Sequence, residues 1–182
     1  MTSRRLTIAL TLLALIACSR ATSPAVATSA NSYAEADIQR LRSATRAFQS
    51  LDSAVANGFV RDVPSCLVHE DHGAMGYHHV NRANLMAKPV IERPQLLLYE
   101  RMPDGTYKLN GVEFIVPYSL YARDSTPPVL LGQKLQHEDN LNIWYLHVWA
   151  WTTNPDGIFA NFNPTVSCGT TGKVYKPFAR DM

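Results

Sequence analysis

The segment 141–151, Leu-Asn-Ile-Trp-Tyr-Leu-His-Val-Trp-Ala-Trp, is the longest strand candidate in the chain. Side chains of a strand point alternately to its two faces. Both faces of this segment are largely apolar: one carries Ile143, Tyr145, His147, Trp149 and Trp151, and the other carries Trp144, Leu146, Val148 and Ala150. A strand with two apolar faces has to be covered on both sides. We therefore expect it to be a central strand of a sheet.

Three shorter strands are predicted upstream of that segment. The first is Gln95–Glu100, and the Pro-Asp-Gly at 103–105 then makes a turn, because proline presets one backbone dihedral and glycine permits a positive one. Residues 106–109 would return antiparallel, Asn-Gly at 110–111 would make a second tight turn, and residues 112–116 would form the third strand. The pattern predicts an antiparallel meander.

One long amphipathic helix is predicted near the N-terminus. Ser32 and Glu35 have the spacing of a capping box, which places the start of the helix at Ser32. Behind them the residues of one stripe recur at three- and four-residue steps: Ile38, Leu41, Thr45, Phe48, Leu51 and Val55. Asn57-Gly58 would end the helix, because glycine readily takes the left-handed conformation of a C-terminal turn.

This order of elements predicts an α+β fold. The N-terminal helix would pack on a strongly curved, mainly antiparallel sheet or half-barrel. A cupin-like all-β barrel is the alternative, and the predicted helix favours the first arrangement. About 150 residues remain for folding after the N-terminal segment, which suits a single domain, residues 33–182.

The N-terminus has the pattern of a secretory signal. Arg4 and Arg5 precede an apolar or small-residue run, 6–17, of about 12 residues, and a membrane span needs roughly 20. Leu15-Ile16-Ala17-Cys18 looks like a bacterial lipobox, in which the cysteine is acylated and the chain is cut before it. We therefore expect residues 1–17 to be a signal peptide and Cys18 to be lipidated. The length of the run argues against a short transmembrane anchor.

The predicted lipid defines the expected location. Stable anchoring takes more than one acyl chain, which a lipidated cysteine of this class carries. Residues 18–32 are small and polar, so we expect a lipidated, flexible tether. Ser19 after the cysteine implies sorting to the outer membrane in a Gram-negative cell. The domain would then lie outside the cytoplasm, on the periplasmic face.

The chain has three cysteines, and Cys18 is assigned to the lipid. Cys66 and Cys168 are left as a pair in an oxidising compartment, where we expect a disulfide between them. The alternative is two buried free thiols, which is less common outside the cytoplasm. The bond would close a loop of about 100 residues and tie the start of the domain to its end, which the chain-entropy model values at roughly 4 to 5 kcal/mol.

The charge of the expected mature chain argues against nucleic acid as a partner. The whole chain has 17 Lys+Arg and 15 Asp+Glu. Removal of residues 1–17 takes away Arg4 and Arg5 and no acidic residue, which leaves equal numbers of both signs. Without a long basic run, the chain has no electrostatic footprint for a phosphate backbone.

Two polar residues stand in apolar strand candidates. His147 lies in the middle of the most apolar segment, and Glu113 lies between Val112 and Phe114. A buried polar group without a partner costs of order 1 to 3 kcal/mol, and an ionised carboxylate costs more. One solution is that Glu113 and His147 converge with His78 or His79 on a divalent metal ion, since such ligands suit zinc, copper or non-haem iron. The alternative is a Glu–His hydrogen bond without metal.

The remaining histidines and the aromatic residues have simpler interpretations. His69, His72 and His137 stand in polar stretches and are expected in solvated loops. The tryptophans and phenylalanines of residues 144–162 are expected mainly in the core. A second interpretation is that Tyr145, Trp149 and other aromatic residues line a pocket for a small molecule. The pocket would surround the polar trio, which is Glu113, His147 and either His78 or His79.

A set of motifs in fixed order resembles a group of uncharacterised secreted bacterial proteins and lipoproteins. The motifs are Gly-x-Met-Gly-x-His-x-Val-Asn at 73–81, Val-Glu-aromatic at 112–114 and Leu-His-Val-Trp at 146–149, followed by Asn-Pro-Thr-Val-Ser-Cys at 163–168. The resemblance covers roughly residues 33–168. It implies that His78, rather than His79, is the motif histidine, and it implies no reaction. His79 and Phe162 depart from the pattern, which has an aromatic residue and Trp at these places.

Three functions are therefore open from the sequence. The first is a metal-binding lipoprotein domain, with an oxidoreductase or hydrolase activity as one form of it. The second is a non-catalytic module that binds a small ligand in an aromatic-lined cavity. The third is a cell-envelope interaction protein whose polar trio only locks the core.

Overall fold

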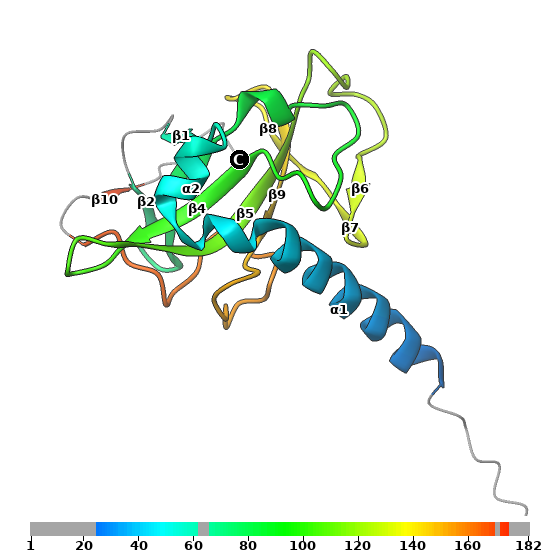
Figure 1. The fold of residues 1–182 in the computed structure, drawn as a ribbon. Coiled ribbons are helices and arrows are strands. Elements are labelled where there is room, and N and C mark those ends of the chain that lie inside the picture. Colours follow the sequence, from blue (N-terminus) through cyan, green and yellow to red (C-terminus); the bar gives the residue numbers. More distant parts are fainter. Residues whose placement is uncertain (1–24, 62–65, 170–171, 175–182) are drawn as a thin grey trace, which may run out of the picture.

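The computed structural model describes residues 25–61, 66–169 and 172–174 (Figure 1). The predicted signal peptide, residues 1–17, and the predicted lipidation site Cys18 lie outside the described residues. Within the described part of the chain, no helix combines the length and the apolar character that a membrane span requires.

Three of the four described helical elements precede the strands, and the fourth lies between β3 and β4. The helical elements are α1 (Ala25–Thr45), the 3-10 helix η1 (Arg46–Gln49), α2 (Leu51–Ala56) and the 3-10 helix η2 (Arg82–Asn84). The strands are β1 (Val60–Arg61), β2 (Cys66–His69), β3 (Gly73–Val80), β4 (Leu96–Arg101), β5 (Tyr107–Pro117), β6 (Val129–Leu130), β7 (Gln133–Lys134), β8 (Gln136–Glu138), β9 (Ile143–Val148) and β10 (Gly172–Val174).

The main sheet of the described residues has the strand order β10-β2-β3-β4-β5-β9-β8, and β1 pairs with β3. All of these pairs are antiparallel except β10 with β2. A separate two-stranded ribbon joins β6 to β7. The prediction of an N-terminal helix with a mainly antiparallel sheet is thus confirmed. The sheet does not close, so the alternative of an all-β barrel is wrong.

One face of the sheet packs against the helices (Figure 1). Ile38 and Leu41 of α1 share a buried cluster with side chains of β4, β5 and β9, among them Leu97, Phe114 and Trp144. Alternation along β4, β5 and β9 then turns their other side chains to the opposite face of the sheet, away from the helices.

The predicted helix begins earlier than expected and is interrupted. It starts at Ala25, so Ser32 lies inside α1 and does not cap it, and residues 25–32 of the expected tether are helical. Alanines in this stretch explain the extension, because alanine has the highest helix propensity. The interruption is at Ser50, which is extended (φ −88°, ψ 121°) and accepts a hydrogen bond from the Ser53 amide as the N-cap of α2. The predicted end at Asn57-Gly58 is confirmed, with Gly58 at φ 88°.

The first predicted turn of the meander is confirmed and the second is wrong. Gly105 has φ 88°, and the Met102 amide donates to the Thr106 carbonyl oxygen across the hairpin. At Asn110-Gly111, however, β5 continues without turning. Leu98 pairs with Gly111 and Tyr99 with Leu109, so Asn110 is the extra residue of a β-bulge.

Gly111 has a steric reason to be glycine. A Cβ at this position would lie 2.6 Å from the Val148 carbonyl oxygen of β9. The close approach of the two backbones brings β5 and β9 together next to the pair formed by Glu113 and His147. The bulge therefore replaces the expected turn and sets the register of the strand that carries Glu113.

The predicted disulfide between Cys66 and Cys168 is confirmed, with a Cα–Cα distance of 5.5 Å. Both cysteines are buried in a second cluster with Ala74, Tyr77 and Trp149. The bond links the first residue of β2 to the segment that follows the bridge between Ala74 and Asn163. It therefore fastens the C-terminal part of the chain beside the strand that carries His78.

Candidate metal centre

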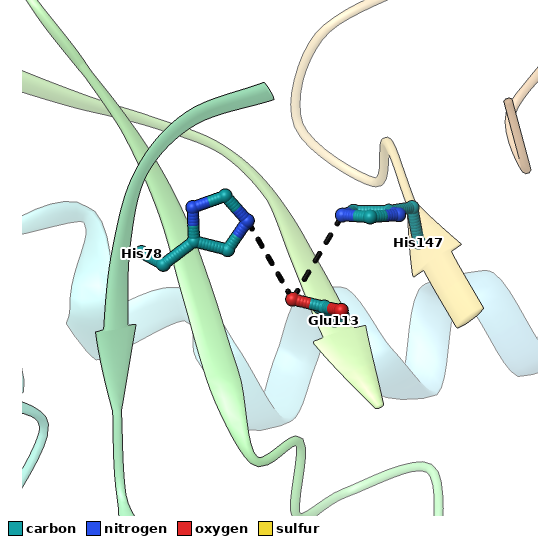
Figure 2. A group of neighbouring side chains, drawn as sticks. All are labelled: His78, Glu113 and His147. Atoms are coloured by element: carbon teal, nitrogen blue, oxygen red, sulfur yellow. Dashed lines mark ion pairs between the residues drawn. The ribbon is translucent and has the colours of Figure 1, made fainter. Parts of the chain in front are cut away.

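Three strands each contribute one side chain to a cluster on the face of the sheet opposite the helices. His78 comes from β3, Glu113 from β5 and His147 from β9 (Figure 2). Glu113 and His147 are direct partners in the antiparallel pair of β5 and β9. His78 reaches Glu113 over β4, which lies between their strands. The sequence prediction that these three residues converge is confirmed.

The three side chains are close enough to share one ion. Glu113 Oε2 lies 3.6 Å from His78 Nε2 and 3.8 Å from His147 Nε2. One ligand atom from each residue lies within 4.8 Å of the others. A tetrahedral zinc ion with bonds of about 2.0–2.1 Å keeps its ligand atoms roughly 3.4 Å apart. The two distances from Glu113 to the histidine nitrogens are within a few tenths of an ångström of that separation.

The cluster is buried and its hydrogen bonds are incomplete. Relative exposure is 5% for His78, 6% for Glu113 and 2% for His147. Among the described residues, neither ring nitrogen of His147 has a hydrogen-bond partner of good geometry, and His78 Nδ1 also has none. The distances to Glu113 exceed those of a good hydrogen bond, which argues against the alternative of a Glu–His hydrogen bond. The polar atoms of the three side chains therefore face one another without forming good hydrogen bonds to one another.

Burial changes the protonation of all three groups. It raises the pKa of Glu113 to about 8, with a smaller contribution from the charge of Glu138. Burial lowers the pKa of His78 to about 4 and the pKa of His147 to about 3; for His147 the neighbouring His78 adds to the shift and Asn161 opposes it. At neutral pH the metal-free trio therefore consists of a protonated carboxyl group and two neutral imidazoles, which is the protonation that metal ligation requires of histidine.

The trio lines a cavity of about 390 Å³. Most of the wall is apolar and comes from several strands, as with Leu67, Val80, Leu96, Ile115, Ile143 and Phe162. This volume falls in the range of small-molecule pockets. The sequence analysis predicted that both faces of β9 are covered by other side chains. The face that carries His147 borders the cavity instead.

The two predicted pocket residues, Tyr145 and Trp149, lie in different parts of the structure. Tyr145 lines the cavity, and its hydroxyl accepts a hydrogen bond from Asn161 Nδ2 at 3.0 Å. Trp149 lies beyond the end of β9, packs in the cluster around the disulfide and donates from Nε1 to the Ala160 carbonyl oxygen at 2.6 Å. The alternation expected for 141–151 ends at Val148, because β9 ends there. Trp149 was therefore wrongly placed beside His147.

The other histidines lie apart from the trio. His79 follows His78 on β3, and its ring packs against Tyr99, 5.0 Å between centroids, on the other face of the sheet. This arrangement supports the motif prediction that His78 is the relevant one. His69 and His72 are in ring contact with each other, 4.5 Å between centroids, and His137 lies 3.9 Å from Trp144. None of these three is buried, as expected. Only His72 lies in a turn, whereas His69 ends β2 and His137 lies in β8, so the prediction of a loop was wrong for these two.

Three polar residues of the cavity were missed by the sequence analysis: Arg82, Glu138 and Asn161. Arg82 begins η2, Glu138 ends the short strand β8, and Asn161 lies in the loop after β9. Each stands in a stretch without periodic pattern, so no sequence signal marked it. Asn161 Oδ1 is buried and has no hydrogen-bond partner, which adds a free acceptor to this end of the cavity.

The donor set fits a divalent ion. Two neutral imidazoles and one carboxylate supply three ligands from rigid strands, and a cavity lies in front of them. Zinc, copper and iron are all bound by such sets, and three protein ligands leave coordination positions for water or another molecule. The buried trio can therefore hold a metal ion that is accessible to a small ligand.

Comparison with known proteins assigns no family to the chain. Comparisons with protein-family models, curated proteins and solved structures find no match for the chain. The resemblance to uncharacterised secreted bacterial proteins stays a prediction from motifs. The function has to come from the side chains of the cavity.

Proposed function

We propose that this domain binds one divalent metal ion, zinc, copper or iron, through His78, Glu113 and His147 and presents it to a small molecule in the adjoining cavity. The observation that carries the proposal is the environment of His147, whose two ring nitrogens are buried without hydrogen bonds while Nε2 lies 3.8 Å from a carboxylate oxygen. A metal ion between these atoms would accept a lone pair from each of His78, Glu113 and His147. The metal would act as a Lewis acid toward a bound molecule.

Zinc titration of the purified chain tests this proposal. We expect one zinc ion per chain, and we expect the His147→Ala variant to bind zinc at least about a hundredfold more weakly, more than the loss typical of an outer-shell partner. The matched control is His72→Ala, which removes an exposed histidine outside the trio and leaves zinc binding unchanged. Equal affinity of the His147→Ala and wild-type chains would exclude the trio as the site.

Proton release gives a second expected result. Near pH 7 the carboxyl group of Glu113 carries a proton, because its pKa is about 8, and both imidazoles are already neutral. Zinc binding has to displace that proton, so about one proton should be released per ion. Calorimetric titrations at pH 6.5 in buffers of different ionisation enthalpy measure this number. Release that stays near zero at pH 6.5 would show that Glu113 is not a ligand.

A second candidate function is the binding of a small apolar molecule without metal. The apolar wall of the cavity favours it, because such walls are typical of small-ligand sites. The two functions are distinguished by treatment with a chelator. If the metal ion holds the small molecule, the chelator releases both of them. If the apolar wall alone holds it, the small molecule stays bound after the chelator is added.

We further propose that the domain is held at a bacterial membrane through a lipid on Cys18. The lipobox at residues 15–18 supports this location, and a disulfide in the folded domain is compatible with an oxidising compartment. In a bacterial host that processes lipoproteins, we expect the full chain in the membrane fraction and the Cys18→Ser variant outside it. An unchanged distribution between fractions would exclude the lipid anchor.

A further inference from the structure

Asn161 lies in a loop whose backbone is held on both sides of it. The carbonyl oxygen of Ala160, just before it, accepts a hydrogen bond from Trp149 Nε1 at 2.6 Å. The carbonyl oxygen of Phe162, just after it, accepts a hydrogen bond from Asn154 Nδ2 at 2.8 Å. These two bonds hold the carboxamide of Asn161 in the wall of the cavity that contains the metal ligands.

The Tyr145 hydroxyl sets the orientation of that carboxamide. The hydroxyl donates its one proton to Gln136 Oε1 at 3.2 Å, and it accepts a hydrogen bond from Asn161 Nδ2 at 3.0 Å. Because the proton of the hydroxyl is already used, the atom of Asn161 that faces it has to be a donor, which is Nδ2 and not Oδ1. Oδ1 is then the free acceptor of the carboxamide, and among the described residues it is buried without a partner.

His147 carries a nitrogen that matches this acceptor. Its ring lies beside the ring of Tyr145, with 5.6 Å between centroids, and its Nε2 is the nitrogen that faces Glu113 Oε2 at 3.8 Å. Nδ1 is the other ring nitrogen, buried and without a partner of good geometry among the described residues. Asn161 opposes the lowering of the pKa of His147 that burial causes, as an acceptor beside an imidazole N–H does.

We propose that Asn161 is a positioning residue of the metal site, whose Oδ1 accepts a hydrogen bond from Nδ1–H of His147 and keeps the lone pair of Nε2 for the ion. This inference rests on the proposed metal site and adds a residue outside the three ligands. A neutral imidazole ligates through Nε2 only when its proton is on Nδ1, and metal-bound histidines almost always donate that second N–H to an acceptor. One hydrogen bond thus gives a partner to two buried atoms.

Zinc titration of two variants of the purified chain tests the role of the acceptor. Asn161→Leu has a side chain of similar size without an acceptor, and it should bind one zinc ion about 10- to 100-fold more weakly than the wild type. Asn161→Asp keeps an acceptor oxygen and should bind zinc at least as tightly as the wild type. The matched control is Gln133→Leu on β7, an exposed residue outside the cavity, which should leave zinc binding unchanged.

The proton on Nδ1 gives a readout that a purely structural role of Asn161 would not change. In the zinc-loaded chain with isotope-labelled histidine, nuclear magnetic resonance should show an Nδ1–H signal of His147 that exchanges slowly with water. Its contact with the ring of Tyr145 assigns the signal. In Asn161→Leu, kept saturated by excess zinc, this proton should exchange much faster, whereas Asn161→Asp should keep the slow exchange.

The outcomes separate this inference from the metal site itself. If the wild type and Asn161→Leu bind zinc equally tightly, the positioning role is wrong and the metal site stands. If both variants at Asn161 bind zinc weakly, or if the Nδ1–H signal is the same in Asn161→Leu and the wild type, Asn161 serves only the loop and the inference is also wrong. If the wild type does not bind zinc, both proposals fail together.

Discussion

Loss of the Cys66–Cys168 disulfide is expected to lower the free energy of unfolding by about 4 to 5 kcal/mol. The two cysteines are separated by 102 residues, so the bond removes a large amount of conformational freedom from the unfolded chain. In the folded state the bond joins β2 to the segment after the bridge at Asn163, and both sulfur-bearing residues are buried. Reduction therefore leaves the native contacts in place and acts mainly on the unfolded state.

Urea unfolding of the Cys66→Ala/Cys168→Ala double variant measures this loss. The control is the effect of a reductant, which should destabilise the wild-type chain by a similar amount and leave the double variant unchanged. A loss below about 1 kcal/mol would contradict the entropic account and indicate that the unfolded chain is already compact.

Two of the three side chains of the metal centre, Glu113 and His147, were predictable because each conflicts with its surroundings. A carboxylate between Val112 and Phe114, and an imidazole between Leu146 and Val148, have no favourable place in an apolar strand unless they meet a partner. Alternation then separates His78 from its neighbour His79, since adjacent residues of β3 point to opposite faces. Local chemistry was sufficient to choose Glu113 and His147, whereas the choice of His78 over His79 came from the motif resemblance.

The arrangement of the strands could not be predicted with the same certainty. Asn-Gly is a strong hairpin signal, and at 110–111 it gives a bulge within one long strand instead. The deciding contact is the carbonyl oxygen of Val148, which lies 2.6 Å from the place of a Cβ on Gly111. That contact joins residues far apart in the sequence, so no local pattern contains it. The same holds for Arg82, Glu138 and Asn161, which reach the cavity from three separate parts of the chain.

The Glu113→Gln variant is expected to bind zinc more than about a hundredfold more weakly than the wild type. The substitution keeps the shape of the side chain. Among the described residues, it removes the only carboxylate within 4 Å of the two histidines. A first ligand that also carries the compensating charge should cost more than the roughly 10- to 100-fold loss seen for outer-shell partners. Calorimetric titration with zinc at pH 7 measures the change, and the exposed His72→Ala variant is again the control.

The same substitution should have the opposite effect on the metal-free protein. Folding raises the pKa of Glu113 from 4.5 to about 8, so between these values the folded state binds a proton that the unfolded state has lost. The stability of the metal-free wild type therefore falls as pH rises through this range. The variant has no such group, and its stability relative to the wild type should increase with pH from about 4.5 to about 8 and then level off.

Unfolding measured with and without zinc brings the two effects together. Without metal at pH 8, Glu113→Gln should be the more stable chain, because the buried carboxyl group no longer opposes folding. With zinc in excess, the wild type should gain stability with the logarithm of the ratio of the zinc concentration to its Kd, and the variant should gain little. The order of the two chains should thus reverse on addition of metal. A variant that is less stable under both conditions would mean that Glu113 serves the packing of the core, and a variant that gains as much from zinc as the wild type would mean that the ion binds elsewhere.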